Sequence, residues 1–389
     1  MSQLCVYLPP FSSDYSGVCT CLFDLNGMVV IHDASCCCAN YVSYDEPRWF
    51  GNKRPIYCSA LREIDAILGD DEKFIRKVVT ACESMKPEFI AVLGSPVPTI
   101  IGSDMNGIAQ EIEGKTGVPT FGFSTTGFRY YNRGVAEAMV KFVQYYGGEK
   151  RQQKPSGVNI LGLTVLDFSD NSNAADIRNL FEENGFEVIC SFMMGCSLMD
   201  IQRSTQAEVN IVVSQSGMAL ANFMEKEWGI PYVAVTPLGN AGSEAVVRAV
   251  RQAREDRKSR VLHCEGLHDG EVLLLGEQMI ANSLRNSLAQ SYGVKGVTVG
   301  CLFGMDKALA QDFDIDIRDE RHIRDLITSG KFSKLVADPL MKVLLKDRDI
   351  SFFPLPHVAV SSKLYWHRYK TFIGDKMEAF IAQIAGTPM

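Results

Sequence analysis

Short apolar runs alternate with helix-like segments along most of this chain, and this alternation constrains the fold more than any single motif. The runs at 158–168, 209–217 and 231–239 are rich in Val, Ile and Leu, and each predicts a buried strand. Between the first two runs, segment 174–186 carries apolar residues at helical spacing. Strands that are apolar on both faces and are separated by helices are typical of parallel sheets joined by right-handed crossovers. We therefore expect an α/β protein.

Two polar segments interrupt the alternation and predict domain boundaries. Segment 145–157 contains glycines and ends at Pro-Ser-Gly, whereas segment 254–270 is charged and has no periodicity. A chain of 389 residues is long enough for two or three domains. We expect three Rossmann-like α/β domains around a central cleft, followed by a C-terminal helix that packs back on the first domain. The expected limits are 1–153, 154–260 and 261–356 for the domains and 357–389 for the helical segment.

The loops that follow the expected strands are the candidates for ligand binding. In open parallel sheets, ligands bind beyond the carboxyl ends of the strands, so these loops should face a common cleft between the domains. The loops are 94–102, 195–200, 214–217, 237–242, 276–278, 301–304 and 354–362.

The overall charge and the missing motifs exclude several classes of function. A net charge of −7 argues against a nucleic-acid partner, which usually requires a basic surface. No run of about 18 apolar residues predicts a membrane span. The sequence has no Walker A motif and no G-x-G-x-x-G after a strand, so ATP hydrolysis would belong to a partner protein. It also lacks a G-x-S-x-G elbow and a C-x-x-C zinc pair.

The cysteines are concentrated near the amino terminus. Seven of the 12 lie in the first 58 residues, and three of them, Cys36, Cys37 and Cys38, are consecutive. Without a secretion signal we expect a cytoplasmic protein, whose thiols are core residues, metal ligands or reactive groups. In an extended segment Cys36 and Cys38 would share one side and Cys37 would face the other. Cys58 precedes an acidic helix start, where we expect the helix dipole to favour a thiolate.

A series of motifs, in order along the chain, resembles the nitrogenase component 1 family. This family includes the nitrogenase cofactor scaffold, dark-operative protochlorophyllide reductase and the reductase of coenzyme F430 synthesis. The series begins with "IHDASCCCANY" and continues through "ACESMKPEFIAVLGSPVPTIIGSDMNGI" and "AEVNIVVSQSGMALANFMEKEWGIPY". The matching segments are 31–41, 54–74, 81–108, 118–128, 207–232, 270–288 and 349–362. The resemblance implies three parallel-sheet α/β domains around a cleft.

The same resemblance implies an iron–sulfur cluster at a subunit interface, fed by an ATP-dependent iron–sulfur reductase. Of the three cysteines that the first domain of the family supplies, only Cys37 is present, because the other positions fall at Ser13 or Asp14 and at Pro96. We expect one [4Fe–4S] cluster that bridges a homodimer, since soft thiolates suit such clusters and about four protein ligands are needed. The expected ligands are Cys37 with Cys58, Cys36 or Cys38, and Asp14 is a further candidate. The alternative is that these thiols only fill space in the core.

The resemblance also predicts residues that face the cleft. His357 lies close to the family histidine that holds the active-site cofactor, and we expect it to bind metal or to donate a proton. The cysteine partner of that cofactor falls near Ser214, so Ser214, Gln215 and Ser216 are candidates for hydrogen bonds to a ligand. Cys196 follows a strand and either faces the substrate or packs in the core.

"YDEPRW" at 44–49 follows the thiols and either lines an interface or reductase-docking surface, or forms an exposed turn.

These observations predict a nitrogenase-like iron–sulfur oxidoreductase subunit that reduces a substrate bound between the domains. The sequence does not distinguish between a small molecule, a tetrapyrrole and a metal cofactor as the substrate. A second hypothesis is a non-catalytic scaffold or carrier for a metal cluster or cofactor. A third is a ligand-binding relative that has kept the fold and lost the cluster.

Overall fold

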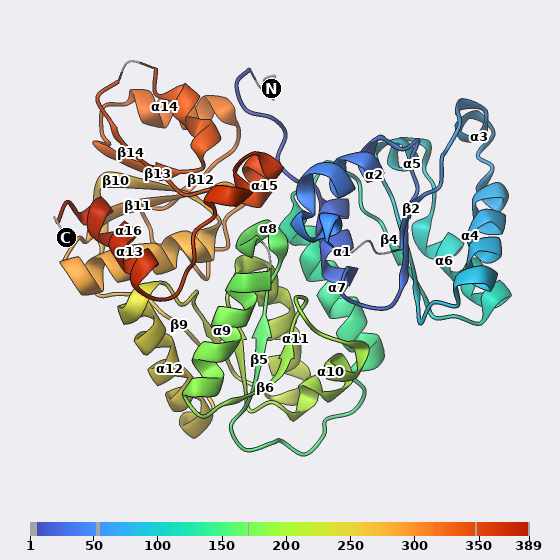
Figure 1. The fold of residues 1–389 in the computed structure, drawn as a ribbon, viewed down its shortest axis with the longest axis horizontal. Coiled ribbons are helices and arrows are strands. Elements are labelled where there is room, and N and C mark those ends of the chain that lie inside the picture. Colours follow the sequence, from blue (N-terminus) through green and yellow to red (C-terminus); the bar gives the residue numbers. More distant parts are fainter. Residues whose placement is uncertain (1–5, 52–54, 170, 347, 388–389) are drawn as a thin grey trace.

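Three parallel sheets form the framework of this computed structural model, which describes residues 6–51, 55–169, 171–346 and 348–387 (Figure 1). The expectation of an α/β fold with three parallel sheets is confirmed. The sheets occupy residues 28–123, 157–261 and 268–354. The limits of the three domains stay a prediction. We refer to the three parts of the chain built on these sheets as the first, second and third units.

Every strand pair in the three sheets is parallel. The first sheet has the order β2-β1-β3-β4, with β1 (Met28–Ile31), β2 (Ile56–Cys58), β3 (Ile90–Leu93) and β4 (Thr120–Phe123). The second has the order β6-β5-β7-β8-β9, with β5 (Gly157–Leu161), β6 (Glu187–Ser191), β7 (Val209–Val212), β8 (Tyr232–Ala234) and β9 (Arg260–Val261). The third has the order β12-β11-β10-β13-β14, with β10 (His268–Gly276), β11 (Gly296–Cys301), β12 (Ile315–Asp316), β13 (Lys334–Ala337) and β14 (Ser351–Pro354).

Helices connect the strands and pack on the sheets. The first unit contains α1 (Asp14–Leu22), α2 (Cys36–Asn40), α3 (Glu63–Leu68), α4 (Asp71–Met85), α5 (Pro96–Ile101), α6 (Met105–Thr116) and α7 (Tyr131–Tyr146). The second contains α8 (Val165–Phe168), α9 (Asn171–Glu183), α10 (Leu198–Arg203), α11 (Met218–Trp228) and α12 (Gly239–Asp256). The third contains α13 (Gln278–Tyr292) and α14 (Glu320–Thr328), and is followed by α15 (Val358–Ser361) and α16 (Asp375–Ala385). Short helical turns are η1 (Tyr41–Asp45), η2 (Pro47–Phe50), η3 (Ser204–Gln206), η4 (Gln215–Gly217), η5 (Pro339–Leu344) and η6 (Ser362–Arg368). Among the described residues, no helix is long and apolar enough to cross a membrane.

Helices α1 and α7 cross at two glycines. A Cβ atom on Gly17 would overlap the carbonyl oxygen of Tyr131, and one on Gly134 would overlap that of Asp14. Both overlaps are with backbone, which cannot move aside as a flexible side chain can. The two helices can therefore cross this closely only because both positions are glycine. The crossing fixes the first turns of the two helices against each other.

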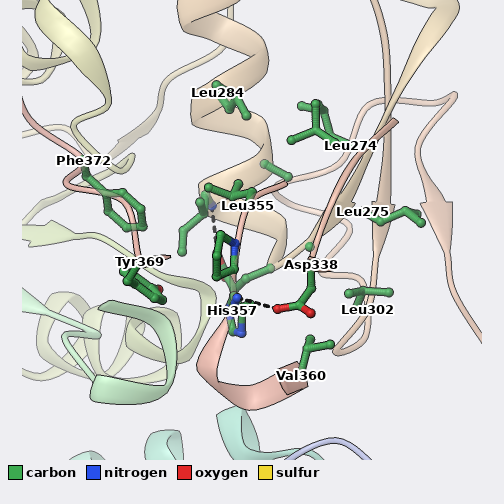
Figure 2. Close-up of a pocket in the computed structure, with 16 residues that line it drawn as sticks. Leu274, Leu275, Leu284, Leu302, Asp338, Leu355, His357, Val360, Tyr369 and Phe372 are labelled. Atoms are coloured by element: carbon green, nitrogen blue, oxygen red, sulfur yellow. Dashed lines mark hydrogen bonds between the residues drawn. The ribbon is translucent and has the colours of Figure 1, made fainter. Parts of the chain in front are cut away.

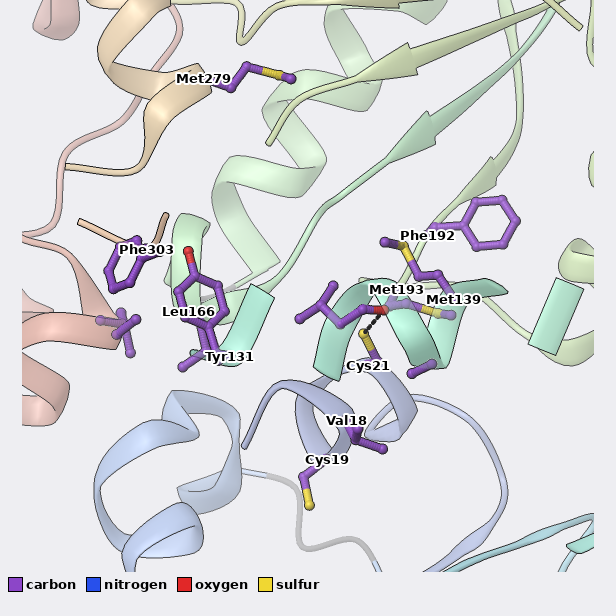
Figure 3. Close-up of a cluster of buried hydrophobic side chains, with 14 of the residues drawn as sticks. Val18, Cys19, Cys21, Tyr131, Met139, Leu166, Phe192, Met193, Met279 and Phe303 are labelled. Carbon is purple, nitrogen blue, oxygen red and sulfur yellow. Dashed lines mark hydrogen bonds between the residues drawn. The ribbon is translucent and has the colours of Figure 1, made fainter. Parts of the chain in front are cut away.

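A shared apolar core joins the three units. One cluster of buried side chains includes Val18 of the first unit, Phe192 of the second and Met279 of the third (Figure 3). Because burial of apolar surface stabilises packed elements in rough proportion to the area removed from water, this shared core fixes how the units sit relative to one another.

The C-terminal segment contacts more than the first unit. Its initial part does return there: the backbone N–H of Ser12 donates to the carbonyl oxygen of Ala359 at 2.8 Å, and η6 packs on η1. Helix α16, in contrast, packs against α12 and α13 (Figure 1). The amphipathic face of α16 thus covers the junction of the second and third units, and only residues 358–368 follow the expected path.

Candidate functional site

The three consecutive cysteines begin a short helix. Asp33 Oδ2 accepts hydrogen bonds from the backbone N–H groups of Ser35 at 2.8 Å and Cys37 at 2.9 Å, and this carboxylate holds the first turn of α2. Successive side chains on a helix are about 100° apart, so the expectation that Cys36 and Cys38 share one side of an extended segment is wrong. Cys36 is exposed, and Cys37 and Cys38 are half-buried.

A groove of about 480 Å³ lies beside two of these thiols, and we call it the thiol groove. Cys36 and Cys37 line it from the first unit, while α15 and the following residues line it from the C-terminal segment. Its other walls include the N-terminal stretch before α1. The lining residues are Pro9, Pro10, Phe11, Ser12, Ser13, Tyr15, Cys36, Cys37, Asn40, Tyr44, Asp45, Gly127, Val360, Ser361, Ser362 and Leu364. The groove is therefore large enough for a cofactor, and two thiols line it.

Cys38 and Cys58 are not among the residues that line the thiol groove. The Cys58 thiol donates to the carbonyl oxygen of Asp33 at 3.1 Å and accepts from the backbone N–H of Ala60 at 3.3 Å. Cys58 ends β2, and α3 begins only at Glu63, so the expected helix dipole does not act on this thiol. Burial raises the pKa of Cys58, which contradicts the expectation of a favoured thiolate.

The two half-buried thiols of the cysteine helix, Cys37 and Cys38, resist ionisation. Burial, followed by the charge of Asp33, raises the pKa of Cys37 to about 12. Burial, followed by Cys58, raises the pKa of Cys38 to about 12. A metal that binds these thiols must therefore displace their protons, and its affinity should increase with pH.

Asp14 is committed to hydrogen bonds within the protein. Its carboxylate accepts from the backbone N–H of Gly127 at 2.8 Å and of Thr126 at 3.0 Å, and it pairs with Arg129 Nε at 2.8 Å. The expectation that Asp14 binds iron is therefore wrong, since a metal would have to displace all of these partners. Across the described residues, no group of three or more His, Cys, Asp or Glu side chains is placed to hold a metal ion. Two thiols on one groove fit one half of a four-thiolate site.

His357 lies at an enclosed cavity on the carboxyl side of the third sheet (Figure 2). The cavity has a volume of about 20 Å³ that the centre of a water molecule can occupy. This is room for about one water molecule. We call it the inner cavity. Its polar side chains are Glu277, Asp338, His357 and Tyr369, and the others are apolar. The lining residues are Leu274, Leu275, Gly276, Glu277, Ile280, Ala281, Leu284, Leu302, Val336, Asp338, Leu355, Pro356, His357, Val360, Tyr369 and Phe372.

The imidazole of His357 is buried, with 8% of the residue exposed. Its backbone N–H donates to Asp338 Oδ2 at 2.8 Å, which fixes the start of α15. Neither ring nitrogen forms a hydrogen bond of good geometry with a described residue. The Oδ1 atom of Asp167 lies 3.3 Å from Nε2, and the ring packs on Phe303 with centroids 5.1 Å apart. The imidazole therefore keeps hydrogen-bonding capacity for a ligand.

Asp167 connects His357 to the other two units. This fully buried residue belongs to α8 of the second unit, and its carboxylate accepts from the hydroxyl of Tyr131 in the first unit. Thr164 Oγ1 also donates to it, at 3.0 Å, and Tyr369 donates to its backbone carbonyl. Burial and the negative charge of Asp167 raise the pKa of Tyr131 well above its usual value, so the phenol stays a hydrogen-bond donor.

Glu277 follows β10 and faces the same junction. Its carboxyl accepts from the backbone N–H groups of Gln215 and Ile280, both at 2.7 Å. Burial, followed by the charge of Asp167, raises the pKa of Glu277 to about 8. Most of this carboxyl is therefore protonated at neutral pH. Glu277 lies in the loop 276–278, which the sequence predicted to bind a ligand. No feature of the sequence pointed to Asp167 or Tyr131 as residues of this site.

The predicted ligand-binding residues after β7 are divided between two roles. Gln215 joins all three units, because its side chain accepts from Asn132 at 3.1 Å and donates to Gln278 at 3.2 Å while its backbone holds Glu277. Ser214 donates to the carbonyl oxygen of Gly162 at 2.7 Å, and its hydroxyl is also 2.7 Å from that of Ser216. These two buried serines stabilise the loop, and their contact with a ligand stays a prediction.

Cys196 lies in the apolar core, with 6% of the residue exposed. It is a close neighbour of Cys190, whose pKa is raised well above its usual value by burial and then by Cys196. This position favours the packing alternative, and contact with a substrate stays a prediction.

The segment at 44–49 contains a buried ion-pair network. Arg48 Nε lies 2.7 Å from Glu46 Oε1, and its Nη1 lies 3.0 Å from Asp24 Oδ2. Asp24 in turn accepts from the backbone N–H of Gly195 in the second unit at 2.8 Å. Glu46 and Arg48 are both buried, so for these residues the expectations of a docking surface and of an exposed turn are both wrong.

Comparisons with known proteins identify the family and the fold of this chain. A profile of the family described as "Nitrogenase component 1 type Oxidoreductase" matches residues 13–266. One subunit of the light-independent protochlorophyllide reductase of Nostoc punctiforme is 23% identical over 265 residues, which cover 60% of this chain and 52% of that protein. The nitrogenase molybdenum-iron protein alpha chain of Methanosarcina barkeri is 21% identical over 204 residues, which cover 51% and 38%. This chain thus spans about half the length, or less, of these curated relatives.

A solved structure entitled "Nitrogenase Cp1 at pH 6.5" has the same fold. Its TM-score is 0.74 at 15% sequence identity, and the match covers 99% of this chain and 93% of that chain. At this identity the likeness shows the fold alone. The match of the family profile covers more than half of the chain, and this protein therefore belongs to the nitrogenase component 1 type oxidoreductase family.

Proposed function

We propose that this protein is a nitrogenase-like iron–sulfur oxidoreductase subunit. In this proposal it accepts low-potential electrons from an ATP-dependent reductase and reduces a substrate bound between its three units. The observation that carries the proposal is the placement of two thiols and a buried imidazole on either side of one helix. Val360 of α15 lines both the thiol groove and the inner cavity, and His357 precedes the same helix.

The thiol groove supports Cys36 as the partner ligand of Cys37, because both line it. The same two residues of a second copy would complete four thiolates around one [4Fe–4S] cluster on a two-fold axis. When bound, such a cluster supplies one-electron transfer at low potential. The chain's own contribution is to hold these thiols on α2 through the Asp33 carboxylate, and to separate them from the inner cavity by a single helical turn.

A scaffold or carrier for a metal cofactor is the second candidate. It is favoured by the small inner cavity, whose room for about one water molecule does not admit a large substrate in this conformation. It is also favoured by the loss of two of the three family thiolates, at Ser13 or Asp14 and at Pro96.

Anaerobic purification followed by iron and sulfide analysis tests the proposal. We expect about four iron and four sulfide per dimer, and a paramagnetic signal after dithionite reduction. The Cys37→Ala and Cys36→Ala variants should lose the iron. The matched control is Cys190→Ala, a buried thiol of the second unit, which should keep it. Equal iron in Cys37→Ala and Cys190→Ala would contradict the ligand assignment. Iron-free protein from anaerobic cells would contradict the cluster itself.

Turnover with a cognate ATP-dependent reductase then separates the two candidates. If this protein is an oxidoreductase, it reduces its substrate repeatedly and keeps its cluster. If it is a carrier, it holds the cluster or cofactor and transfers it without consuming electrons.

A further inference from the structure

Two titratable side chains with different surroundings face the inner cavity. Glu277 comes from the loop after β10, and His357 comes from the loop after β14. Both loops lie at the carboxyl ends of strands, where parallel sheets bind their ligands. The cavity between them admits one group of about the size of a water molecule.

The surroundings of these two groups assign them different roles. Burial and the nearby charge of Asp167 outweigh the backbone donors to Glu277 and keep its carboxyl neutral near pH 7. His357 instead faces the carboxylate of Asp167 through Nε2, so Nδ1 is the ring atom left for a ligand. Neighbouring titratable groups held in opposite environments are the usual sign of an acid–base pair.

The other titratable groups at the cavity are already engaged. Asp338 accepts from the backbone N–H of His357 at 2.8 Å, from Ser361 Oγ at 2.7 Å and from the backbone N–H of Leu340 at 2.9 Å. Tyr131 donates to Asp167, and Tyr369 donates to the backbone carbonyl of the same residue. Glu277 also accepts two backbone hydrogen bonds, but its protonated carboxyl keeps an O–H group to donate. The two ring nitrogens of His357 form no hydrogen bond with the residues that the structure describes, so Glu277 and His357 are the groups that can donate to a ligand.

We propose that the inner cavity is a proton-delivery site in which Glu277 and His357 protonate the unsaturated end of the substrate, and that Asp167 is a positioning residue for His357. This inference rests on the proposed function for its electrons, which come from the low-potential iron–sulfur donor. It adds Glu277 as a second proton donor beside His357 and gives Asp167 a positioning role, and neither the family membership nor the thiols identify these two assignments.

The proposed step balances for the reduction of one double bond. Two electrons arrive from the donor, and two protons arrive from the pair. The O–H bond of Glu277 breaks as one new bond to hydrogen forms, and the Nδ1–H bond of the protonated His357 ring breaks as the second forms. Glu277 is left as a carboxylate and His357 as a neutral imidazole, and both regain protons from solvent before the next cycle.

The position of Asp167 explains why the three units must meet for this site to work. Tyr131 of the first unit holds one oxygen of the carboxylate, and Thr164 of the second unit holds the other. This leaves Asp167 fixed opposite the His357 ring of the third. A carboxylate that is held in this way sets the orientation of an imidazole, as the acidic member of a catalytic triad does.

Infrared difference spectroscopy of the whole protein tests the role of Glu277 without a known substrate. We expect a carboxylic-acid C=O band at neutral pH that is lost in Glu277→Gln and that disappears in the wild type with a midpoint near pH 8. The control is Glu320→Gln, because Glu320 is a buried carboxylate whose Oε2 accepts three backbone N–H groups. That variant should keep the band. An unchanged band in Glu277→Gln would overturn the proposal.

Nitrogen-15 NMR of the histidine rings tests the role of Asp167. We expect Asp167→Asn to shift the His357 ring resonances and to leave those of His322 on α14 in place. If Asp167→Asn does not fold, Tyr131→Phe removes one donor to the same carboxylate and should also shift the His357 ring resonances. Unchanged His357 resonances in the folded variants would overturn the positioning role. Both measurements can be made without iron, so their outcome is separate from that of the cluster analysis.

Discussion

Replacement of Glu277 by glutamine should change how the stability of the protein depends on pH. In the folded chain, burial and the charge of Asp167 raise the pKa of Glu277 from 4.5 to about 8. Between these values the native state holds a proton that the unfolded chain has released, so the free energy of unfolding falls as pH rises. This contribution is fully present below about pH 4.5, is lost progressively as pH rises through about 8, and is constant above that.

The size of the effect follows from the shift. Each pKa unit corresponds to about 1.4 kcal/mol, so the full rise gives an upper value of about 5 kcal/mol. Relaxation of the buried site lowers the cost of ionising the carboxyl, so we expect a measured change of about 2 to 5 kcal/mol. The glutamine side chain has nearly the same shape as the carboxylic acid and does not titrate, so the variant should gain stability relative to the wild type as pH rises.

Urea unfolding of both proteins between about pH 5 and pH 9 measures this difference. The control, Glu320→Gln, should instead give a stability curve parallel to that of the wild type over this pH range. Burial opposes the ionisation of Glu320, but its three backbone donors outweigh this effect and hold its pKa below the usual value. Its contribution is therefore present above the unfolded pKa and is lost as the pH falls through the folded one. Parallel pH curves for Glu277→Gln and the wild type would show that Glu277 is ionised in the native state, and our reasoning would fail.

Two further substitutions test the fold around the site. Gly134→Ala should cost several kcal/mol in thermal or urea unfolding, because its Cβ would overlap the Asp14 carbonyl where α1 crosses α7. Gly114→Ala in α6, which has open space around its Cβ, should instead be neutral or stabilise by about 0.5–1 kcal/mol; equal losses would refute this account of the crossing. Arg48→Met should destabilise by about 3–5 kcal/mol, since it leaves two carboxylates without their buried partner. Arg248→Met removes only an exposed helical pair and should cost about 0.5 kcal/mol or less, and a similar loss in both variants would contradict a special role for the buried network.

The backbone conformation of the segment with three cysteines could not be predicted from its local sequence. The cluster of cysteines near the amino terminus was visible in the sequence, but its conformation was not. Asp33 caps the first turn of α2 by accepting from the backbone of Cys37, and this local hydrogen bonding converts an expected extended segment into a helix. The direction of each thiol then follows from the helix, which places Cys36 and Cys37 on the thiol groove and leaves Cys58 bonded to the backbone of Asp33.

The α/β class, the three parallel sheets and the loops at their carboxyl ends could be predicted from the amino-acid sequence. A strand that is covered on both faces must be apolar throughout, and this pattern is visible in a short stretch of sequence. The meeting of Tyr131, Asp167, Glu277 and His357, in contrast, depends on the packing of the whole chain. These residues come from three units and are far apart in the sequence, and their contact depends on how the shared apolar core fixes the units. The raised pKa of Glu277 arises from that same burial, which no local pattern encodes.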